Sequence, residues 1–187
     1  MTDTSASIRR RLLGGAAVAA GLAGAGFAWW RGQQQAVQQG SSRNPGDTQA
    51  LAAFWSLTLN TPSGKDLALL SLRGKPLLIN FWATWCPPCV EELPLIDGFY
   101  QKNIANGWQV LGLAVDQLVA VNAFLGKQPI SFPVALAGPA GIELSKSFGN
   151  LSGGLPFTVV LSASGNVVQR KIGRITPEDL VAWSSVR

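Results

Sequence analysis

The sequence predicts an α/β domain in which helices cover both faces of a mixed sheet. Two continuous apolar runs, 75–83 and 108–116, have the character of buried parallel strands. Each run is followed by a segment with helical spacing, and a strand–turn–strand pattern precedes the last helix. Apolar residues make up 47% of the chain and charged residues 13%, so the composition supplies a core and argues against disorder.

From residue 51 onward, strands and helices alternate. A hairpin is predicted first, with strands within 54–60 and 67–72 around a turn that contains proline and glycine. The helix after the first buried strand is expected from Val90 to about Asn106, because its apolar residues recur at spacings of three and four. The remaining predicted elements are, in order, a helix at 117–127, a strand at 130–137, a short helix at 141–149, strands at 156–162 and 167–173 around a tight turn at 163–166, and a helix at 176–186 with Thr176 as its N-cap and Pro177 in its first turn.

The N-terminal part divides into two predicted segments ahead of the folded domain. Residues 1–31 contain a basic cluster followed by an uncharged apolar run that is long enough to cross a bilayer as a helix. We expect a membrane anchor here, with a cleaved signal peptide as the alternative, and in both cases an exported domain. Residues 32–50 are polar and rich in Gln, Ser and Gly, which predicts a flexible linker. The folded domain is then expected at 51–187.

Charge and histidine content exclude two classes of function. Of the net charge of +5, residues 1–50 carry +3, from five arginines and two aspartates. The folded part therefore has no strong basic surface, and nucleic acid is not an expected partner. The chain has no histidine and only two cysteines, whereas zinc and copper sites usually draw several ligands from these residues. No metal site is predicted.

The two cysteines, Cys86 and Cys89, lie in the stretch "WCPPC". This stretch follows the first buried strand and begins the next helix, which is the edge where open α/β sheets place their ligand chemistry. Such a pair is half a metal site, a structural staple or a redox centre. A disulfide across so short a loop adds little stability, and ligands for a metal are lacking. A redox centre is therefore the favoured interpretation.

The motif in this setting resembles a known family. The run "WCPPCVEELP" after a buried strand, together with the later "GLPFTVVLSASGNVV", is similar to the membrane-anchored TlpA-like and DsbE-like thiol–disulfide oxidoreductases of bacterial envelopes. The resemblance covers 51–187 and implies a thioredoxin fold with an N-terminal hairpin and an extra strand and helix within 117–150. It further implies a bacterial inner-membrane anchor with a periplasmic domain, disulfide-bearing client proteins such as apocytochrome c or metalloprotein precursors, a membrane thiol as electron donor, and no cofactor.

Roles for the motif residues follow from the chemistry of thiols. A helix N-terminus favours the thiolate, so Cys86 is expected to attack a client disulfide and Cys89 to release the client. Pro87 and Pro88 have no backbone N–H to stabilise that thiolate, which predicts a reductant rather than an oxidant. Trp85 beside the attacking cysteine is expected to contribute to the client-binding surface.

A proton carrier and a client-binding loop complete the predicted site. Glu92 lies one helical turn after Cys89 and is the candidate that takes up or supplies its proton. Thioredoxins often carry a buried aspartate on the preceding strand, where this chain has Asn80, which cannot titrate. By resemblance, Pro156 is expected to be a cis-proline that presents the backbone of Leu155 to a client.

Several neighbouring residues are given structural roles instead. Glu91 is expected to be a surface acid of the first helical turn, and Asp116 an N-cap. Phe81 and Trp82 are assigned to the core. Two alternatives to the reductase remain open from sequence: a thiol peroxidase of related fold, and a module that binds copper or a client without turnover.

Overall fold

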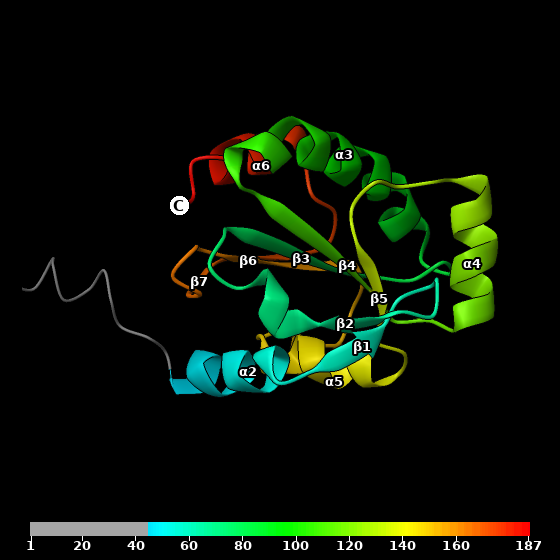
Figure 1. Cartoon of the computed structure of the whole chain (residues 1–187), viewed down its shortest axis with the longest axis horizontal. Coiled ribbons are helices and arrows are strands. Elements are labelled where there is room, and N and C mark those ends of the chain that lie inside the picture. Colours follow the sequence, from blue (N-terminus) through cyan, green and yellow to red (C-terminus); the bar gives the residue numbers. More distant parts are fainter. Residues whose placement is uncertain (1–44) are drawn as a thin grey trace, which may run out of the picture. The chain divides into compact units, whose positions relative to one another are not determined.

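The computed structural model describes residues 45–187 (Figure 1). The predicted anchor at 1–31 and most of the predicted linker at 32–50 lie outside the described residues. Within 45–187, none of the helices combines the length and the apolar character needed to cross a membrane.

A five-stranded mixed sheet forms the centre of the fold, with the strand order β5-β4-β3-β6-β7. Its strands are β3 (Leu77–Trp82), β4 (Gln109–Ala114), β5 (Val134–Leu136), β6 (Phe157–Leu161) and β7 (Val167–Ile172). The first three are parallel to one another, whereas β6 and β7 run antiparallel to their neighbours. All six residues of β3 are buried, as its continuous apolar sequence predicts for a central strand covered on both faces.

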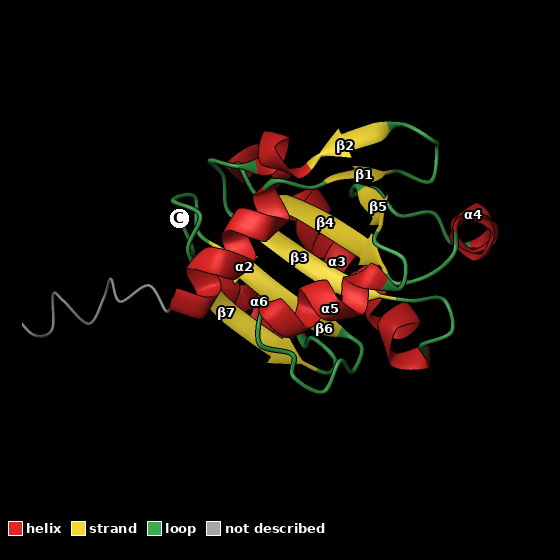
Figure 2. Cartoon of the chain, turned by 90° about the horizontal axis from the view of Figure 1, so that it is seen from below, coloured by secondary structure: helices red, strands yellow, loops and turns green. Residues whose placement is uncertain are grey.

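Helices cover both faces of this sheet, and the predicted thioredoxin fold is confirmed. The helices α3 (Pro87–Asn103) and α6 (Pro177–Trp183) lie on one face, and α2 (Pro45–Trp55) and α5 (Ala140–Ser147) on the other (Figures 1 and 2). A further helix, α4 (Leu118–Lys127), packs its Phe124 ring 5.3 Å from the ring of Trp82 at the end of β3. Two separate apolar cores, one on each side of the sheet, hold these layers together.

The predicted N-terminal hairpin forms a small sheet of its own, made of β1 (Thr58–Asn60) and β2 (Asp66–Ala68). Its second strand is shorter than predicted, because the chain turns into the 3-10 helix η1 (Leu69–Leu72). Leu69 is the buried residue of that turn, and its N–H donates to the carbonyl of Leu57. In a continued strand, successive side chains would point to opposite faces. The 3-10 turn instead directs Leu69 into the core and leaves its neighbours outside.

The helix α2 corrects two predictions at the start of the domain. It begins at Pro45, inside the predicted linker, and it includes the residues predicted to begin the first strand. The residues that anchor it, Ala50 and Phe54, are four apart and fully or almost fully buried, and Phe54 contacts the ring of Phe148 edge-on at 5.8 Å. The apolar residues of this helix are consecutive, 50–55, and therefore give almost no helical period. An ion pair between Asp47 and Arg170 of β7 also joins the helix to the sheet.

The C-terminal elements agree with the prediction. Gly165 has a φ of 80° in the turn between β6 and β7, a conformation that glycine adopts without a steric cost. Thr176 caps α6 in a complete capping box, in which its hydroxyl accepts from the Asp179 N–H and the Asp179 carboxylate accepts from the Thr176 N–H. After α3, the 3-10 helix η2 (Ile104–Asn106) ends the predicted helical segment.

Candidate active site

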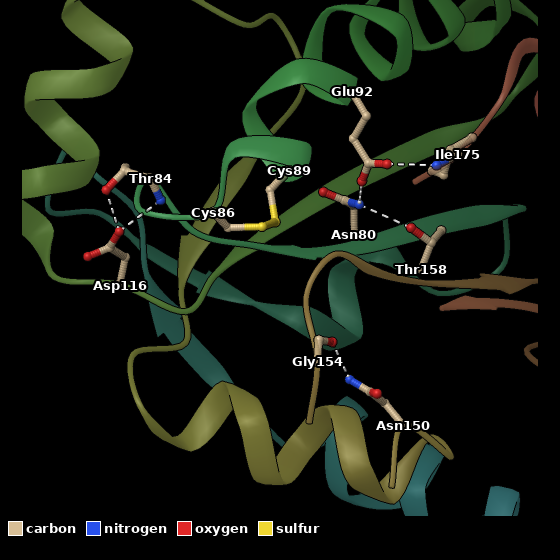
Figure 3. Close-up of a disulfide and its surroundings, with 10 residues drawn as sticks. All are labelled: Asn80, Thr84, Cys86, Cys89, Glu92, Asp116, Asn150, Gly154, Thr158 and Ile175. Atoms are coloured by element: carbon tan, nitrogen blue, oxygen red, sulfur yellow. Dashed lines mark hydrogen bonds between the residues drawn. A yellow bond between two sulfur atoms is a disulfide. The ribbon is translucent and has the colours of Figure 1, made fainter. Parts of the chain in front are cut away.

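The two cysteines lie where the central strand β3 passes into α3, and they form a disulfide with each other (Figure 3). Cys86 is the N-cap of α3, and its side chain accepts no capping hydrogen bond. Cys86 retains 5% of its accessible surface, whereas Cys89, one helical turn further on, is fully buried. Of the two cysteines, only Cys86 therefore has accessible surface in the oxidised protein.

Two prolines occupy the first positions of α3 after the N-cap, with Pro87 at N1 and Pro88 at N2. An N-cap side chain usually accepts from the backbone N–H of N2 or N3. Proline at N2 has no N–H, and the N3 donor, Cys89, instead donates to the Cys86 carbonyl at 3.0 Å. The Cys86 sulfur therefore lacks the nearby backbone donors that would stabilise a thiolate at this helix end.

Glu92 is buried beneath the start of α3, with 1% of its surface accessible. Its carboxylate reaches toward the sheet, and the two oxygens have different partners (Figure 3). One oxygen, Oε1, accepts from the Asn80 side-chain amide at 2.8 Å, and Oε2 accepts from the Ile175 N–H at 2.7 Å. The same amide nitrogen of Asn80 donates to the Thr158 hydroxyl at 3.0 Å. One acidic group thus connects α3, β3, β6 and the loop before α6.

Burial dominates the electrostatics of Glu92 and raises its pKa above the ordinary value of 4.5. Hydrogen bonds from Ile175 and Asn80, and the charge of Arg174, act in the opposite direction without cancelling the effect of burial. Arg174 itself pairs with Glu91 at 2.7 Å on the surface, where both side chains are more than half exposed. Glu91 is therefore a solvated surface acid, and Glu92 is the acid with a perturbed pKa that a proton carrier requires.

Asp116 corrects a prediction, because it is not an N-cap. The N-cap of α4 is Gln117, which makes no side-chain cap hydrogen bond. Asp116 instead accepts from the Thr84 hydroxyl at 2.6 Å and from the Thr84 N–H at 2.9 Å (Figure 3). These bonds connect the loop after β4 to the loop that leads into Cys86. Burial acts to raise the pKa of this carboxyl, but the bonds from Thr84 and from the Gln117 N–H together hold the pKa below 3.8.

We expect Asp116→Ala to loosen the loop before the cysteines and to destabilise the domain by roughly 1.5–3 kcal/mol, the usual value of hydrogen bonds to a charged group. Because its pKa is lowered on folding, Asp116 contributes stability above the ordinary pKa and loses that contribution as the pH falls through the lowered one. Denaturant unfolding and hydrogen exchange at the Thr84 amide measure these effects.

Asp97 supplies a matched control, since its carboxylate accepts from the N–H and hydroxyl of Ser131 in the same way. Asp97→Ala should expose the Ser131 amide to exchange and leave the Thr84 amide protected. Equal protection of Thr84 in wild type and Asp116→Ala would show that the loop does not depend on this carboxylate.

The loop before β6 lies on the side of the disulfide opposite the start of α3 (Figure 3). Its Leu155–Pro156 peptide bond is cis, as predicted. Within residues 45–187, neither the N–H nor the C=O of Leu155 forms a hydrogen bond. The start of this loop is held by Asn150, whose amide donates to the Gly154 carbonyl at 2.8 Å and to Ser145 (Figure 3). The backbone of half-buried Leu155 is therefore unpaired between the hydrogen-bonded Gly154 and Pro156, and its side chain packs against the core cluster that contains both cysteines.

Three segments next to the strand ends at the disulfide have no charged side chain: the start of α3 with the loop before it, α4 up to Gly126, and the loop before β6 with the start of that strand. Register places these regions together, since Trp82 of β3 pairs with Ala114 of β4 and Phe81 pairs with Phe157 of β6. We call them the redox face, and they comprise residues 83–90, 117–126 and 149–158. Trp85 is 63% exposed on this face.

Of the residues singled out from the sequence, some lie at the disulfide and others belong to the core. Phe81 and Trp82 are fully buried in the core, as expected. The sequence did not single out Thr158 or the Ile175 N–H, because a threonine in a strand and a backbone amide carry no signal of their own. Among residues 45–187, no three His, Cys, Asp or Glu side chains lie close enough together to hold a metal ion.

The fold and this site together define a thioredoxin-fold protein with a redox-active CxxC disulfide. The family model for Redoxin matches residues 44–182. The chain is 35% identical over 121 residues to the thiol-disulfide oxidoreductase ResA of Bacillus thuringiensis, covering 64% of this chain and 68% of that protein. It is 25% identical over 162 residues to the sporulation thiol-disulfide oxidoreductase A of Bacillus subtilis, covering 84% and 89%.

A solved structure gives the same result. The thiol:disulfide interchange protein of Chlorobium tepidum superimposes with a TM-score of 0.60 at 32% identity, covering 68% of this chain and 92% of that one. The chain therefore belongs to the Redoxin family, among its ResA-like and DsbE-like members. Its activity is that of a thiol–disulfide oxidoreductase.

Proposed function

We propose that this oxidoreductase acts as a reductant of client proteins, with Cys86 as the attacking thiol. The observation that carries the proposal is Pro88, the second of the two prolines after Cys86, which removes the N2 donor from its sulfur. An oxidant such as DsbA is strong because its reduced form is stabilised. A site without those donors stabilises its thiolate less and favours giving up electrons.

The proposed cycle transfers two electrons to the client. The Cys86 thiolate attacks one sulfur of a client disulfide, a mixed disulfide forms, and the other client sulfur leaves as a thiolate. Cys89 then loses its proton to Glu92 and attacks Cys86, which releases the second client sulfur and leaves the Cys86–Cys89 disulfide. An external dithiol, for which a membrane thiol relay is the proposed source, must reduce this disulfide before the next turnover.

Equilibration with glutathione tests the direction of transfer. We expect a potential nearer to the value of about −270 mV for thioredoxin than to about −120 mV for DsbA. Pro88→Ala restores an N–H at N2 and should raise the potential by roughly 30–60 mV, because one hydrogen bond to a charged group contributes about 1.5–3 kcal/mol and 30 mV corresponds to about 1.4 kcal/mol.

The adjacent proline is the control for that shift. Pro87→Ala restores an N–H only at N1, which does not point at the N-cap side chain, so its potential should stay close to that of the wild type. A wild-type potential near that of DsbA, or equal shifts for the two variants, would contradict the proposal.

The proposed location is the bacterial envelope. The uncharged run within 1–31, flanked by arginines, supports an inner-membrane anchor that carries the domain on the periplasmic side, with cleavage of the segment as the alternative. With α2 included, the proposed linker shortens to 32–44 and the domain extends over 45–187. By family resemblance, the proposed clients are apocytochrome c or metalloprotein precursors that need free thiols.

The redox face supports a particular mode of client binding. We propose that an extended client segment lies against Trp85 and pairs with the free backbone of Leu155. Since the redox face has no charge, apolar contact and main-chain hydrogen bonds would supply the affinity. Client segments with apolar residues beside the cysteine fit this surface better than strongly charged ones.

A further inference from the structure

The polar network under the cysteines is incompletely paired in a specific way. The Asn80 amide nitrogen serves two acceptors, the carboxylate of Glu92 and the hydroxyl of Thr158. The Asn80 oxygen, although fully buried, has no hydrogen-bond partner. The Thr158 hydroxyl accepts from Asn80, and no acceptor for its own proton occurs among the described residues. One buried acceptor and one buried donor are thus left over in the same cluster.

We propose that Asn80 is the positioning residue for the proton of Glu92, and that its side-chain amide rotates by half a turn when Glu92 becomes protonated. With Glu92 ionised, the amide nitrogen faces the carboxylate, as observed. With Glu92 protonated, the amide oxygen takes that place and accepts from the new carboxyl O–H. It accepts from the Thr158 hydroxyl at the same time, so the leftover hydroxyl donor finds a partner, and the NH₂ group turns to the side where the oxygen had none.

The two orientations explain why an amide suits this position. A carboxylate facing an amide nitrogen and a carboxylic acid facing an amide oxygen are both satisfied pairs, and an unsatisfied buried partner costs about 1–3 kcal/mol. Asparagine has a donor and an acceptor on one rotatable group of nearly symmetric shape. Neither leucine nor aspartate at position 80 would serve both forms of Glu92.

Among the groups that contact Glu92, the Asn80 amide is the one that must change its orientation when Glu92 is protonated. The Ile175 N–H donates to the other carboxylate oxygen, Oε2, in a position that serves both forms of Glu92. The strands β3 and β6 present only the neutral groups of Asn80 and Thr158. The charged side chain that acts on Glu92 is Arg174 of the loop before α6, which is paired with Glu91, and the thiol nearest in sequence is Cys89, one helical turn before Glu92.

This rotation rests on the proposed function only for its use, which is to let Glu92 exchange a proton with Cys89 without leaving the carboxyl O–H and the amide N–H as two donors that face each other. The rotation itself can be tested in the oxidised protein. There the cysteines form a disulfide and do not titrate, so the titration of Glu92 is observed without that of the thiols. Failure of the rotation would leave the reductase activity standing, and loss of the activity would leave the rotation standing.

Nuclear magnetic resonance of the oxidised wild-type domain tests the rotation directly. The chemical shift of the Glu92 carboxyl carbon follows its protonation, and cross-peaks between the Asn80 amide protons and Thr158 report the orientation. We expect these cross-peaks to weaken several-fold as the pH falls, with the midpoint of the Glu92 titration. Asn150, another fully buried asparagine with no acidic partner, should keep its amide contacts throughout.

A variant fixes one orientation independently of pH. In Glu92→Gln, the Ile175 N–H requires the new amide oxygen, which turns the new NH₂ group toward Asn80. Asn80 should then present its oxygen at every pH, and its cross-peaks with Thr158 should stay weak. Strong cross-peaks in this variant, or cross-peaks in the wild type that do not change across the Glu92 titration, would overturn the proposal.

Discussion

Cys86→Ser is expected to abolish disulfide reduction, whereas Cys89→Ser is expected to accumulate a covalent complex with the client. Cys86 is the outer sulfur, and Cys89 is fully buried beneath it. Without Cys86 no client disulfide can be attacked. Without Cys89 the attack succeeds, but the mixed disulfide cannot be resolved from within the site. Insulin reduction with dithiothreitol as the electron source measures the first effect.

Trapping measures the second effect and identifies clients. Cys89→Ser, expressed in a bacterial envelope, should yield disulfide-linked species on non-reducing gels that disappear on reduction, and mass spectrometry identifies the linked protein. The double variant Cys86→Ser/Cys89→Ser is the control and should trap nothing. Complexes formed through Cys89 in Cys86→Ser, at a yield equal to that of Cys89→Ser, would reverse the assigned roles.

The same experiment with a purified, unfolded client tests the uncharged redox face. Trapping by Cys89→Ser should proceed at nearly the same rate at low and high salt, because no charged side chain lies within the redox face to attract or repel a client. A rate that falls steeply with salt would mean that charges elsewhere on the domain guide the client.

Glu92→Gln is expected to slow reduction at neutral pH by roughly 10²-fold, the lower end of what general base catalysis contributes. In the wild type, Glu92 must be ionised to take the proton of Cys89, so the rate should fall as the pH drops through its raised pKa. The variant should lose that inflection. Steady-state rates of insulin reduction between pH 5 and pH 9 measure both effects.

Glu91→Gln is a matched control, since it removes a carboxylate one residue away that is solvent-exposed and paired with Arg174. Its rate and pH profile should resemble those of the wild type. If Glu92→Gln kept the wild-type pH profile, Glu92 would have no role in proton transfer.

Stability gives a second measure of the same buried acid. The pKa of Glu92 is raised on folding, so its contribution to stability is fully present below the ordinary value of 4.5 and is lost as the pH rises through the raised pKa. Glutamine does not titrate. Oxidised Glu92→Gln should therefore gain stability relative to the oxidised wild type as the pH rises through this window, as urea unfolding at several pH values would measure.

The strand and helix that carry the cysteines could be predicted because their signals are local. The apolar run of β3 and the spacing of apolar residues in α3 are long and regular. The helix α2 could not be predicted in the same way, because the burial of Phe54 depends on Phe148, the C-cap residue of α5, which is distant in the sequence. A polar start at 45–49 followed by a run of apolar residues without a helical period does not show where the helix begins until its partner is known.

In the candidate site, too, the residues that are close together in the sequence could be predicted, whereas those brought together by the fold could not. That Cys86, Cys89 and Glu92 lie on one helix follows from their spacing, and Pro156 was found through family resemblance. The groups that tune Glu92 are separated from it by 12 residues at Asn80 and 83 at Ile175. No periodicity links such positions, so their contact depends on how the strands and loops assemble.

By itself, the sequence determined that this protein carries a CxxC dithiol at the end of a buried strand, with prolines that remove donors from the attacking sulfur. These properties belong to adjacent residues, and covalent geometry transmits them directly. Only the tertiary structure decided that Asp116 holds the loop before Cys86 through Thr84, and that Glu92 is buried against the side-chain amide of Asn80. The physical reason is that burial and hydrogen-bond partnership are properties of the assembled chain, and they set the pKa values and pairings on which the proposed chemistry depends.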